Sequence, residues 1–289
     1  MSKPYSFVPF LDYKPYNEDG NLEGIIKLKI KVLTPVHISS GKIDEHNGKI
    51  YKKFLRINGE VTIPGTSIKG CVRSIAEAIS YSCYQPGKQV RYNKLPDGKT
   101  NDRLKDCIIC KTFGSMGRKS KVIFSDFKLT KGSMDIIGLP NLYAPHIEEK
   151  LYLLNGKYKG YKFYYHGISS ICEKGTIFFE FAKEGAEFEG EVYYNGLTQR
   201  QLKLLCYSLG LNDDIQPKIG YGKPAYYGSV KFLVRDSDEQ DKYKKYANQY
   251  YNESDANIRK NIDRLKTILS YNNAKRVSDW TQNGNIRTY

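Results

Sequence analysis

The spacing of apolar residues is the feature that most restricts how this chain can fold. Through the first two hundred residues the dominant spacing is two, as in IIKLKIKVL at 25–33 and FEGEVYY at 188–194. A spacing of two places alternate side chains on opposite faces of a strand, so that one face can be buried. Two segments, 66–79 and 198–210, change to the spacing of three and four that is typical of helices. The sequence therefore predicts a sheet protein with few helices in this part.

The order of the predicted elements narrows the fold class. Further strands are predicted at 121–129, 158–165 and 176–182, and Asn58-Gly59 marks the turn of a hairpin within 54–63. The regular strand–helix alternation of a doubly wound parallel sheet is missing. The order strand, hairpin, helix, strands, helix, glycine-rich loop, strand favours an α+β fold of ferredoxin-like or RRM-like type, with large insertions.

A change of composition near residue 235 suggests how the chain is organised. Residues 1–235 are predicted to form the main domain, with an inserted loop at 85–120. Residues 236–289 are charged, rich in Tyr and Asn, and mostly helical by propensity. We predict that they form a helical C-terminal appendage packed on the main domain.

The charge balance points to the kind of partner. The 289 residues include 46 Lys and Arg against 31 Asp and Glu, a net charge of +15. This excess favours a polyanionic partner, nucleic acid before an anionic membrane surface, although simple solubility is the alternative. The chain start lacks the pattern of a signal peptide, and no apolar run approaches the roughly 18 residues that span a bilayer. We expect a cytoplasmic protein with reduced cysteines.

The segment VTIPGTSIKGCVRSIAEAIS at 61–80 predicts a helix start that could hold an anion. Thr66 or Ser67 can cap this helix, and its free N–H groups and the positive end of its dipole attract phosphate. Lys69 and Arg73 are four residues apart, so they share one helix face just beyond the start. The alternative is an ordinary capped helix with two solvated cations.

Two other segments carry basic residues in patterns that suit RNA. IGYGKPAYYGSV at 219–230 could cradle phosphate, although glycine loops also serve as plain strand connections. YKGYKFYYHG at 158–167 places Lys162 and His166 on one strand face, which could contact phosphate or bases. His166 has no visible catalytic partner, so packing or RNA contact is the favoured role for it.

The cysteines form a partial metal signature. Cys107 and Cys110 have the Cys-x-x-Cys spacing, whereas a structural zinc needs four ligands in a tetrahedral array. Cys83 is the best third ligand, and a histidine or Cys71 would supply the fourth. The alternative for Cys71 is that it is simply buried, because it lies beside the apolar stripe of Ile68 and Ile75.

Five segments, in this order, resemble the RAMP superfamily (repeat-associated mysterious proteins) of CRISPR systems. They are LTPVHISSG at 33–41, TIPGTSIKGCVRSIAEA at 62–78, CIICKTFGSMGRKSKVIFSDF at 107–127, GYKFYYHG at 160–167 and KIGYGKPAYYGSVKF at 218–232. Together they extend over roughly residues 25 to 235. The sequence looks most similar to the backbone-type and end-cap RAMP subunits of type III effector complexes.

This resemblance implies an RRM-derived fold that holds the backbone of a CRISPR guide RNA in antiviral defence. The partners that it implies are guide and target RNA, other RAMP subunits and a large polymerase-like subunit. It places the following residues at the RNA: His37, Lys69, Arg73, Lys162, His166, Lys218, Gly220, Gly222 and Lys223. It also implies a zinc in the Cys83, Cys107 and Cys110 region, because some relatives carry one there.

An endoribonuclease is the alternative function. Backbone subunits of this family cut target RNA with a metal-assisted aspartate in the loop after the first strand, and that loop offers Asp44 here. The family's aspartate usually sits shortly before a second strand, where this chain has the basic stretch GKIYKKF. Asp44 can anchor Mg²⁺ only if substrate phosphate and water complete the shell, and a solvated pair with Glu45 is the other interpretation. Processing of precursor CRISPR RNA is a further version of the nuclease hypothesis.

Overall fold

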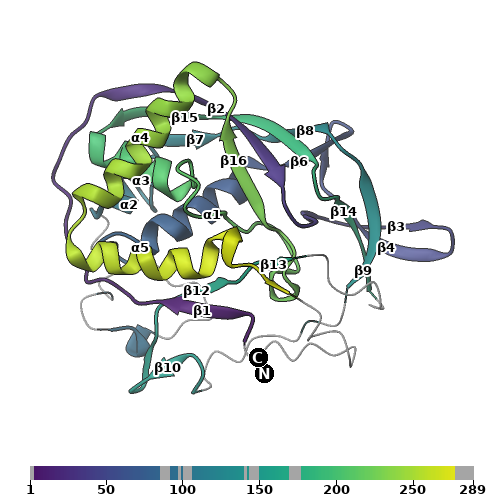
Figure 1. The fold of residues 1–289 in the computed structure, drawn as a ribbon, viewed down its shortest axis with the longest axis horizontal. Helices are drawn as coiled ribbons and strands as arrows, with labels where there is room; N and C mark the ends of the chain where they lie inside the picture. Colours follow the sequence, from purple (N-terminus) through teal and green to yellow (C-terminus); the bar gives the residue numbers. More distant parts are fainter. Residues whose placement is uncertain are drawn as a thin grey trace.

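A seven-stranded antiparallel sheet forms the centre of the protein (Figure 1), which we describe from a computed structural model. The residues described are 3–84, 92–96, 99, 106–139, 142, 150–168 and 177–276. The strand order is β16–β2–β15–β8–β6–β5, with β7 also beside β15. The bounds are β2 (Leu22–Val32), β5 (Arg56–Ile57), β6 (Glu60–Ile63), β7 (Val122–Phe124), β8 (Phe127–Lys131), β15 (Glu187–Leu197) and β16 (Val230–Val234).

Strands β2 and β15 pair over most of their length because their apolar residues alternate in register. Ile26 lies opposite Val192, and Ile30 lies opposite Phe188, and all four side chains are buried on the inner face. The intervening residues of both strands are mostly charged and lie on the outer face. The spacing of two therefore produces the strands that it predicts.

Four helices cover the inner face of this sheet (Figure 1). They are α1 (Gly65–Ala78), α3 (Gln199–Ser208), α4 (Ser237–Glu253) and α5 (Ala256–Leu269). The core elements follow one another as β2, α1, β7, β15, α3 and β16, so the mixed α+β class is confirmed. Buried residues of α4 and α5, such as Tyr243 and Ile262, belong to the same hydrophobic core as the sheet and α1.

A second sheet of order β3–β4–β14–β9 stands at one end of the first. Its strands are β3 (Ser39–His46), β4 (Lys49–Phe54), β14 (Ile177–Ala182) and β9 (Met134–Leu139). The β3–β4 hairpin projects from the body of the protein in Figure 1. The loop that the sequence predicts after the first strand is a hairpin here, because Asn47 and Gly48 adopt positive φ angles of 52° and 72° and close a turn between β3 and β4.

Short elements complete the fold. Three two-stranded pairings join β1 (Tyr5–Val8) to β12 (Tyr161–Tyr164), β10 (Leu153–Leu154) to β11 (Lys157–Tyr158), and β13 (Gly167–Ile168) to β17 (Lys275–Arg276). The 3-10 turns are η1 (Tyr92–Lys94), η2 (Lys223–Ala225) and η3 (Tyr271–Asn273). The predicted inserted loop is not wholly loop, because it contains the buried helix α2 (Ile108–Phe113). Much of its remainder lies outside the described residues.

The predicted cap of α1 is wrong in its detail. Neither Thr66 nor Ser67 caps the helix. The N-cap position is Pro64, which makes no side-chain hydrogen bond to the helix. Instead the carboxylate of Asp126 accepts a hydrogen bond from the Gly65 N–H at 2.9 Å. Because an acidic group of the protein already lies at the positive end of the helix dipole, phosphate is disfavoured there.

Candidate nucleic-acid interface

Helix α1 presents an exposed stripe that is free of large side chains. Thr66, Gly70 and Ser74 recur at intervals of four and are exposed, whereas Ile68 and Val72 on the opposite side are buried. A Cβ atom added at Gly70 would meet nothing within 4 Å. An extended phosphate backbone can therefore approach the side of this helix closely. We call Thr66, Gly70 and Ser74 the α1 stripe.

Three of the predicted RNA-contacting lysines line one cavity beside the α1 stripe. This lysine cavity, of about 140 Å³, is lined on one side by Cys71 and Ser74 of α1. Lys162 comes from β12, and Lys218 and Lys223 come from the glycine-rich segment 218–228. The fold thus brings together residues that are up to about 150 positions apart in the sequence, as between Cys71 and Lys223. Lysine side chains around one cavity favour a phosphate group as its ligand.

Lys218 anchors the glycine-rich segment from within. Its side chain is buried, and its ammonium group donates to the Tyr226 carbonyl at 2.9 Å and the Tyr165 carbonyl at 3.1 Å. Burial lowers the pKa of Lys218 well below its ordinary value. The half-buried Lys223 is the outer lysine of the segment. Lys218 therefore shapes the cavity, and Lys223 is the better placed of the two to meet a ligand.

Lys162 sits among tyrosine rings at the same cavity. Its ammonium group lies 3.9 Å from the ring centre of Tyr5 and donates to the Tyr152 hydroxyl at 2.8 Å. Burial, with the nearby charge of Lys3, lowers the pKa of Lys162 to about 7. An anion bound in the cavity would favour the charged form of this lysine.

The two predicted glycines and His37 form the backbone frame of the segment. Gly220 and Gly222 have φ angles of 80° and 81°, in the left-handed region that suits glycine. The His37 carbonyl accepts a hydrogen bond from the Tyr221 N–H at 3.0 Å. The His37 ring is buried, and its Nδ1 lies 2.7 Å from the Glu180 carbonyl. His37 thus supports the segment by its main chain, and its ring lies inside the protein.

Lys69 and Arg73 lie on the opposite flank of α1 and brace a neighbouring segment. The Lys69 ammonium donates to the Ser120 hydroxyl at 2.8 Å. The Arg73 guanidinium donates to the Gly114 carbonyl at 3.0 Å and forms an ion pair with Glu77 at 2.8 Å. Contact of these two cations with RNA stays a prediction, and the structure gives both of them internal partners.

The ring of His166 is buried inside the protein, and both of its nitrogens have hydrogen-bond partners. Its Nδ1 lies 2.8 Å from the Ser229 hydroxyl, its Nε2 lies 3.0 Å from the Leu269 carbonyl, and its side chain is 1% exposed. Burial lowers the pKa of His166 to about 3, so the ring is neutral at physiological pH. This geometry matches the packing role and leaves no exposed ring edge for RNA.

Asp44 lies on the projecting β3–β4 hairpin. Its carboxylate forms an ion pair with Lys53 at 2.6 Å, and this hydrogen bond lowers the pKa of Asp44. Glu45 is its neighbour but points to the opposite face of the strand. Among the described residues, the cysteine group treated below is the only cluster of three or more metal-ligating side chains. An aspartate paired with lysine on a projecting hairpin has little to offer Mg²⁺.

Substitution of Asp44 is therefore expected to leave RNA cleavage unchanged. The rate at which the purified protein cuts guide-complementary RNA in Mg²⁺ should be the same for the wild type and Asp44→Ala, within about twofold, because Lys53 already neutralises the carboxylate. The measurement is the single-turnover cleavage rate on labelled RNA, with Lys53→Ala as the matched variant that frees Asp44. A loss of more than tenfold in Asp44→Ala alone would assign a catalytic role to this residue.

Cys83, Cys107 and Cys110 converge in a buried cluster, as the sequence predicts. The sulfur of Cys83 lies 3.4 Å from that of Cys110 and 3.6 Å from that of Cys107. Tetrahedral zinc with Zn–S bonds of about 2.3 Å separates its sulfur ligands by about 3.8 Å, so the three thiols fit the ion with a small adjustment. Hydrogen bonds with Cys110 and Cys83 lower the pKa of Cys107.

Of the two fourth ligands that the sequence suggested for this cluster, Cys71 or a histidine, the structure rules out Cys71, and His146 lies outside the described residues. Cys71 is not in the cluster, because its thiol donates to the Lys218 carbonyl at 3.3 Å beside the lysine cavity. No histidine belongs to the cluster among the residues that the structure describes. Residues 85–91, which follow Cys83 and Tyr84, and residues 100–105, which come just before Asp106 and Cys107, lie outside the described residues.

We expect the purified protein to contain about one zinc ion per chain, because three buried thiols at this spacing are a zinc-binding arrangement. Replacing Cys107 with alanine should reduce the zinc content to near zero and lower the midpoint of thermal unfolding. Cys206→Ala, a buried thiol on α3 outside the cluster, is the matched control and should keep the zinc. Elemental analysis after gel filtration measures the content; a metal-free wild type would show a thiol cluster without structural metal.

Sequence reasoning missed two residues of the interface. Ser74 completes the α1 stripe, and its exposure follows from the interval of four that it shares with Gly70. Asp126 closes the end of α1 from 61 positions away, and a local pattern carries no signal for such a contact.

Comparison with known proteins places the chain in a family. The profile of the RAMP superfamily matches residues 29–267, which include the α1 stripe, the lysine cavity and the cysteine cluster. No curated protein matches the sequence. Of the helices among the described residues, none has both the length and the apolar character to cross a membrane. Family membership suggests a CRISPR-associated RNA-binding subunit. Because the match extends over most of the chain, this protein belongs to the RAMP superfamily.

Proposed function

We propose that this protein is an RNA-binding subunit of a type III CRISPR effector ribonucleoprotein. It holds the backbone of the guide RNA against the α1 stripe and the lysine cavity. It assembles with other RAMP subunits and a large polymerase-like subunit around guide and target RNA. The observation that carries the proposal is the convergence of Lys162, Lys218 and Lys223 on one cavity beside α1.

The shape of this site favours holding the backbone over reading the bases. The stripe offers small side chains and an open Gly70, and the cavity is lined by lysines, of which Lys223 is the outermost. Phosphate contacts of this kind position a strand but carry little sequence information. A guide-binding subunit needs this property, because the spacer sequence of a guide changes while its backbone does not.

Lys223→Ala is expected to weaken binding of a labelled guide-length RNA by about 3- to 10-fold at 100 mM salt, because one phosphate contact is lost. The slope of log affinity against log salt concentration should become shallower by about one, whatever the RNA sequence. Fluorescence anisotropy across a salt series measures both quantities. Lys245→Ala, an exposed lysine on α4 away from the cavity, is the control and should change neither.

The source of the RNA is tested in the host complex. RNA extracted from the purified complex should carry the repeat-derived tag of CRISPR guides, and sequencing of that RNA detects the tag. Absence of such RNA, together with unchanged affinity in Lys223→Ala, would refute the proposed function.

A further inference from the structure

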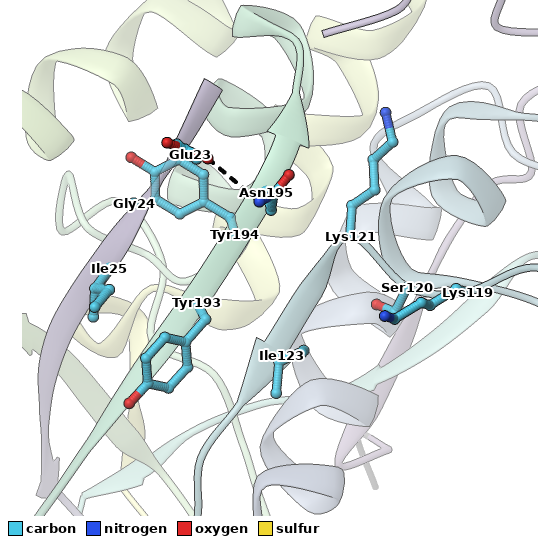
Figure 2. A pocket seen from close by; sticks show the side chains of 10 residues that line it. All are labelled: Glu23, Gly24, Ile25, Lys119, Ser120, Lys121, Ile123, Tyr193, Tyr194 and Asn195. Carbon is cyan, nitrogen blue, oxygen red and sulfur yellow. Dashed lines mark hydrogen bonds between the residues drawn. The ribbon is translucent and has the colours of Figure 1, made fainter. Parts of the chain in front are cut away.

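The outer face of the central sheet carries an exposed apolar row at one end (Figure 2). Tyr193 on β15 lies directly opposite Ile25 on β2 and directly opposite Ile123 on β7. These side chains are 39%, 43% and 56% exposed. They line a broad hollow of about 780 Å³ together with Lys119 and Lys121. We call this place the outer hollow.

The ring of Tyr193 is held along the strand. Its hydroxyl donates to the carboxylate of Glu191, which lies two positions earlier on the same strand face. Figure 2 shows the ring extended along β15 between the strands of Ile25 and Ile123. An aromatic ring fixed in this way, between two aliphatic side chains, offers a flat surface to a planar ligand.

Positive charge exceeds negative charge along this face. Glu187, Glu189 and Glu191 of β15 pair in register with Lys31, Lys29 and Lys27 of β2. On the other side of β15, Lys131 and Lys128 of β8 pair with Glu187 and Glu189. Three carboxylates of β15 thus meet five lysines, one of which, Lys128, also pairs with Glu60 of β6. At the outer hollow itself, two lysines accompany the single carboxylate of Glu23.

The outer hollow is continuous with the α1 flank. Ser120, which lines the hollow, accepts the hydrogen bond from Lys69 of α1. Arg118 and Lys119, just before it, are exposed. The Lys121 ammonium donates to the Gly196 carbonyl at 2.5 Å at the rim of the hollow, and it has two further N–H groups to offer. A basic path therefore leads from α1 over segment 118–121 to Tyr193.

We propose that the outer hollow binds an unpaired stretch of RNA, with one base stacked on Tyr193 and its phosphates at Lys119 and Lys121. Stacking on an aromatic ring flanked by basic residues is the usual way in which proteins bind single strands. A duplex would not fit this role, because its base faces are already stacked. The excess of lysine over carboxylate favours RNA over a protein partner. The proposal rests on the proposed RNA-binding function but concerns a second site, on the opposite face of the sheet from α1.

The test uses the full chain and a fluorescein-labelled single-stranded oligouridylate. Tyr193→Ala should weaken binding by about 5- to 150-fold, the range expected for one lost base–aromatic stack. Tyr193→Phe keeps the ring and should bind within about twofold of the wild type. A fully paired RNA duplex should bind the wild type and Tyr193→Ala equally. With 4-thiouridine in the strand, ultraviolet crosslinks should map to the tryptic peptides 122–128 and 184–200.

The binding measurements on Tyr193→Ala and Lys223→Ala separate the outer hollow from the lysine cavity. If Tyr193→Ala binds the single strand as the wild type does, while Lys223→Ala binds it more weakly, the outer hollow is no RNA site and the proposed function stands. If neither variant differs and the wild type binds no RNA, both proposals fail. If Tyr193→Ala instead converts a wild-type dimer into a monomer in sedimentation without loss of RNA affinity, the face joins protein copies and the proposal is overturned.

Discussion

Replacing Gly220 with alanine is expected to destabilise the protein by about 3–5 kcal/mol, because two separate costs add at this position. Gly220 has a φ angle of 80°, a conformation that costs any residue with a Cβ atom. A Cβ atom here would also lie 2.2 Å from the His37 carbonyl oxygen, which is main chain and cannot rotate away. The glycine-rich segment would have to move, and the lysine cavity would change shape with it.

Urea unfolding followed by circular dichroism measures this effect. The slope of unfolding free energy against urea concentration should be the same in both proteins, which shows that both unfold in two states. Gly70→Ala is the matched control, because Gly70 is in the middle of α1 with open space around it. That substitution should stabilise the protein by about 0.5–1 kcal/mol, since alanine favours helix more than glycine does. An unchanged unfolding midpoint in Gly220→Ala would show that the segment adapts without strain.

Arg56→Ala is expected to cost about 2–4 kcal/mol, because it leaves a buried carboxylate without its cation. The Arg56 guanidinium donates to both carboxylate oxygens of Glu180, one of them at 2.8 Å, and Glu180 is 7% exposed. The Phe54 N–H donates to the same carboxylate at 2.9 Å. These bonds tie β14 of the second sheet to the hairpin that joins it to the central sheet. Their loss should loosen that connection.

The stability difference between wild type and Arg56→Ala should depend on pH. Burial acts to raise the pKa of Glu180, but the hydrogen bonds from Arg56 and Phe54 outweigh it and hold the pKa below the ordinary 4.5. A group whose pKa is lower in the folded state stabilises that state above the unfolded pKa, and loses this effect as the pH falls through the folded value. The difference in unfolding free energy between wild type and Arg56→Ala should therefore have its largest value at pH 6 and become smaller below pH 4.5.

Thermal or urea unfolding at pH 6, 4.5 and 3 measures this dependence. Glu60→Ala, which removes the exposed ion pair with Lys128, is the matched control and should cost less than about 1 kcal/mol. If Arg56→Ala costs no more than this control, the buried carboxylate has found another partner.

Local patterns predicted the elements in which one face is buried. The strands β2, β14 and β15 and the helices α1 and α3 lie where the spacing of apolar residues placed them. The positive φ angles of Asn58 and Gly59, 51° and 83°, confirm the expected hairpin turn. The α+β class follows from this order, and the ferredoxin-like assignment stays a prediction that the order supports.

Elements without a buried face, and contacts across the chain, could not be predicted. Strand β3 is exposed on nearly every residue, so no alternation of apolar residues marks it. Helix α2 is too short and too completely buried to show a helical stripe. The sequence paired Cys83 correctly with the Cys-x-x-Cys motif but could not show that Cys71 turns to the lysine cavity instead. Such contacts depend on how distant strands pack.

The pairing of β2 with β15 and β16 has a consequence for the timing of assembly. β2 ends at residue 32, its partner strands begin at 187 and 230, and the Leu269 carbonyl that binds His166 comes later still. At a synthesis rate of about 5–20 residues per second, the ribosome needs roughly 10–50 s to make the chain between these points. The lysine cavity is therefore finished only after Leu269 has been made, and an RNA strand can bind there only from that point of synthesis onwards.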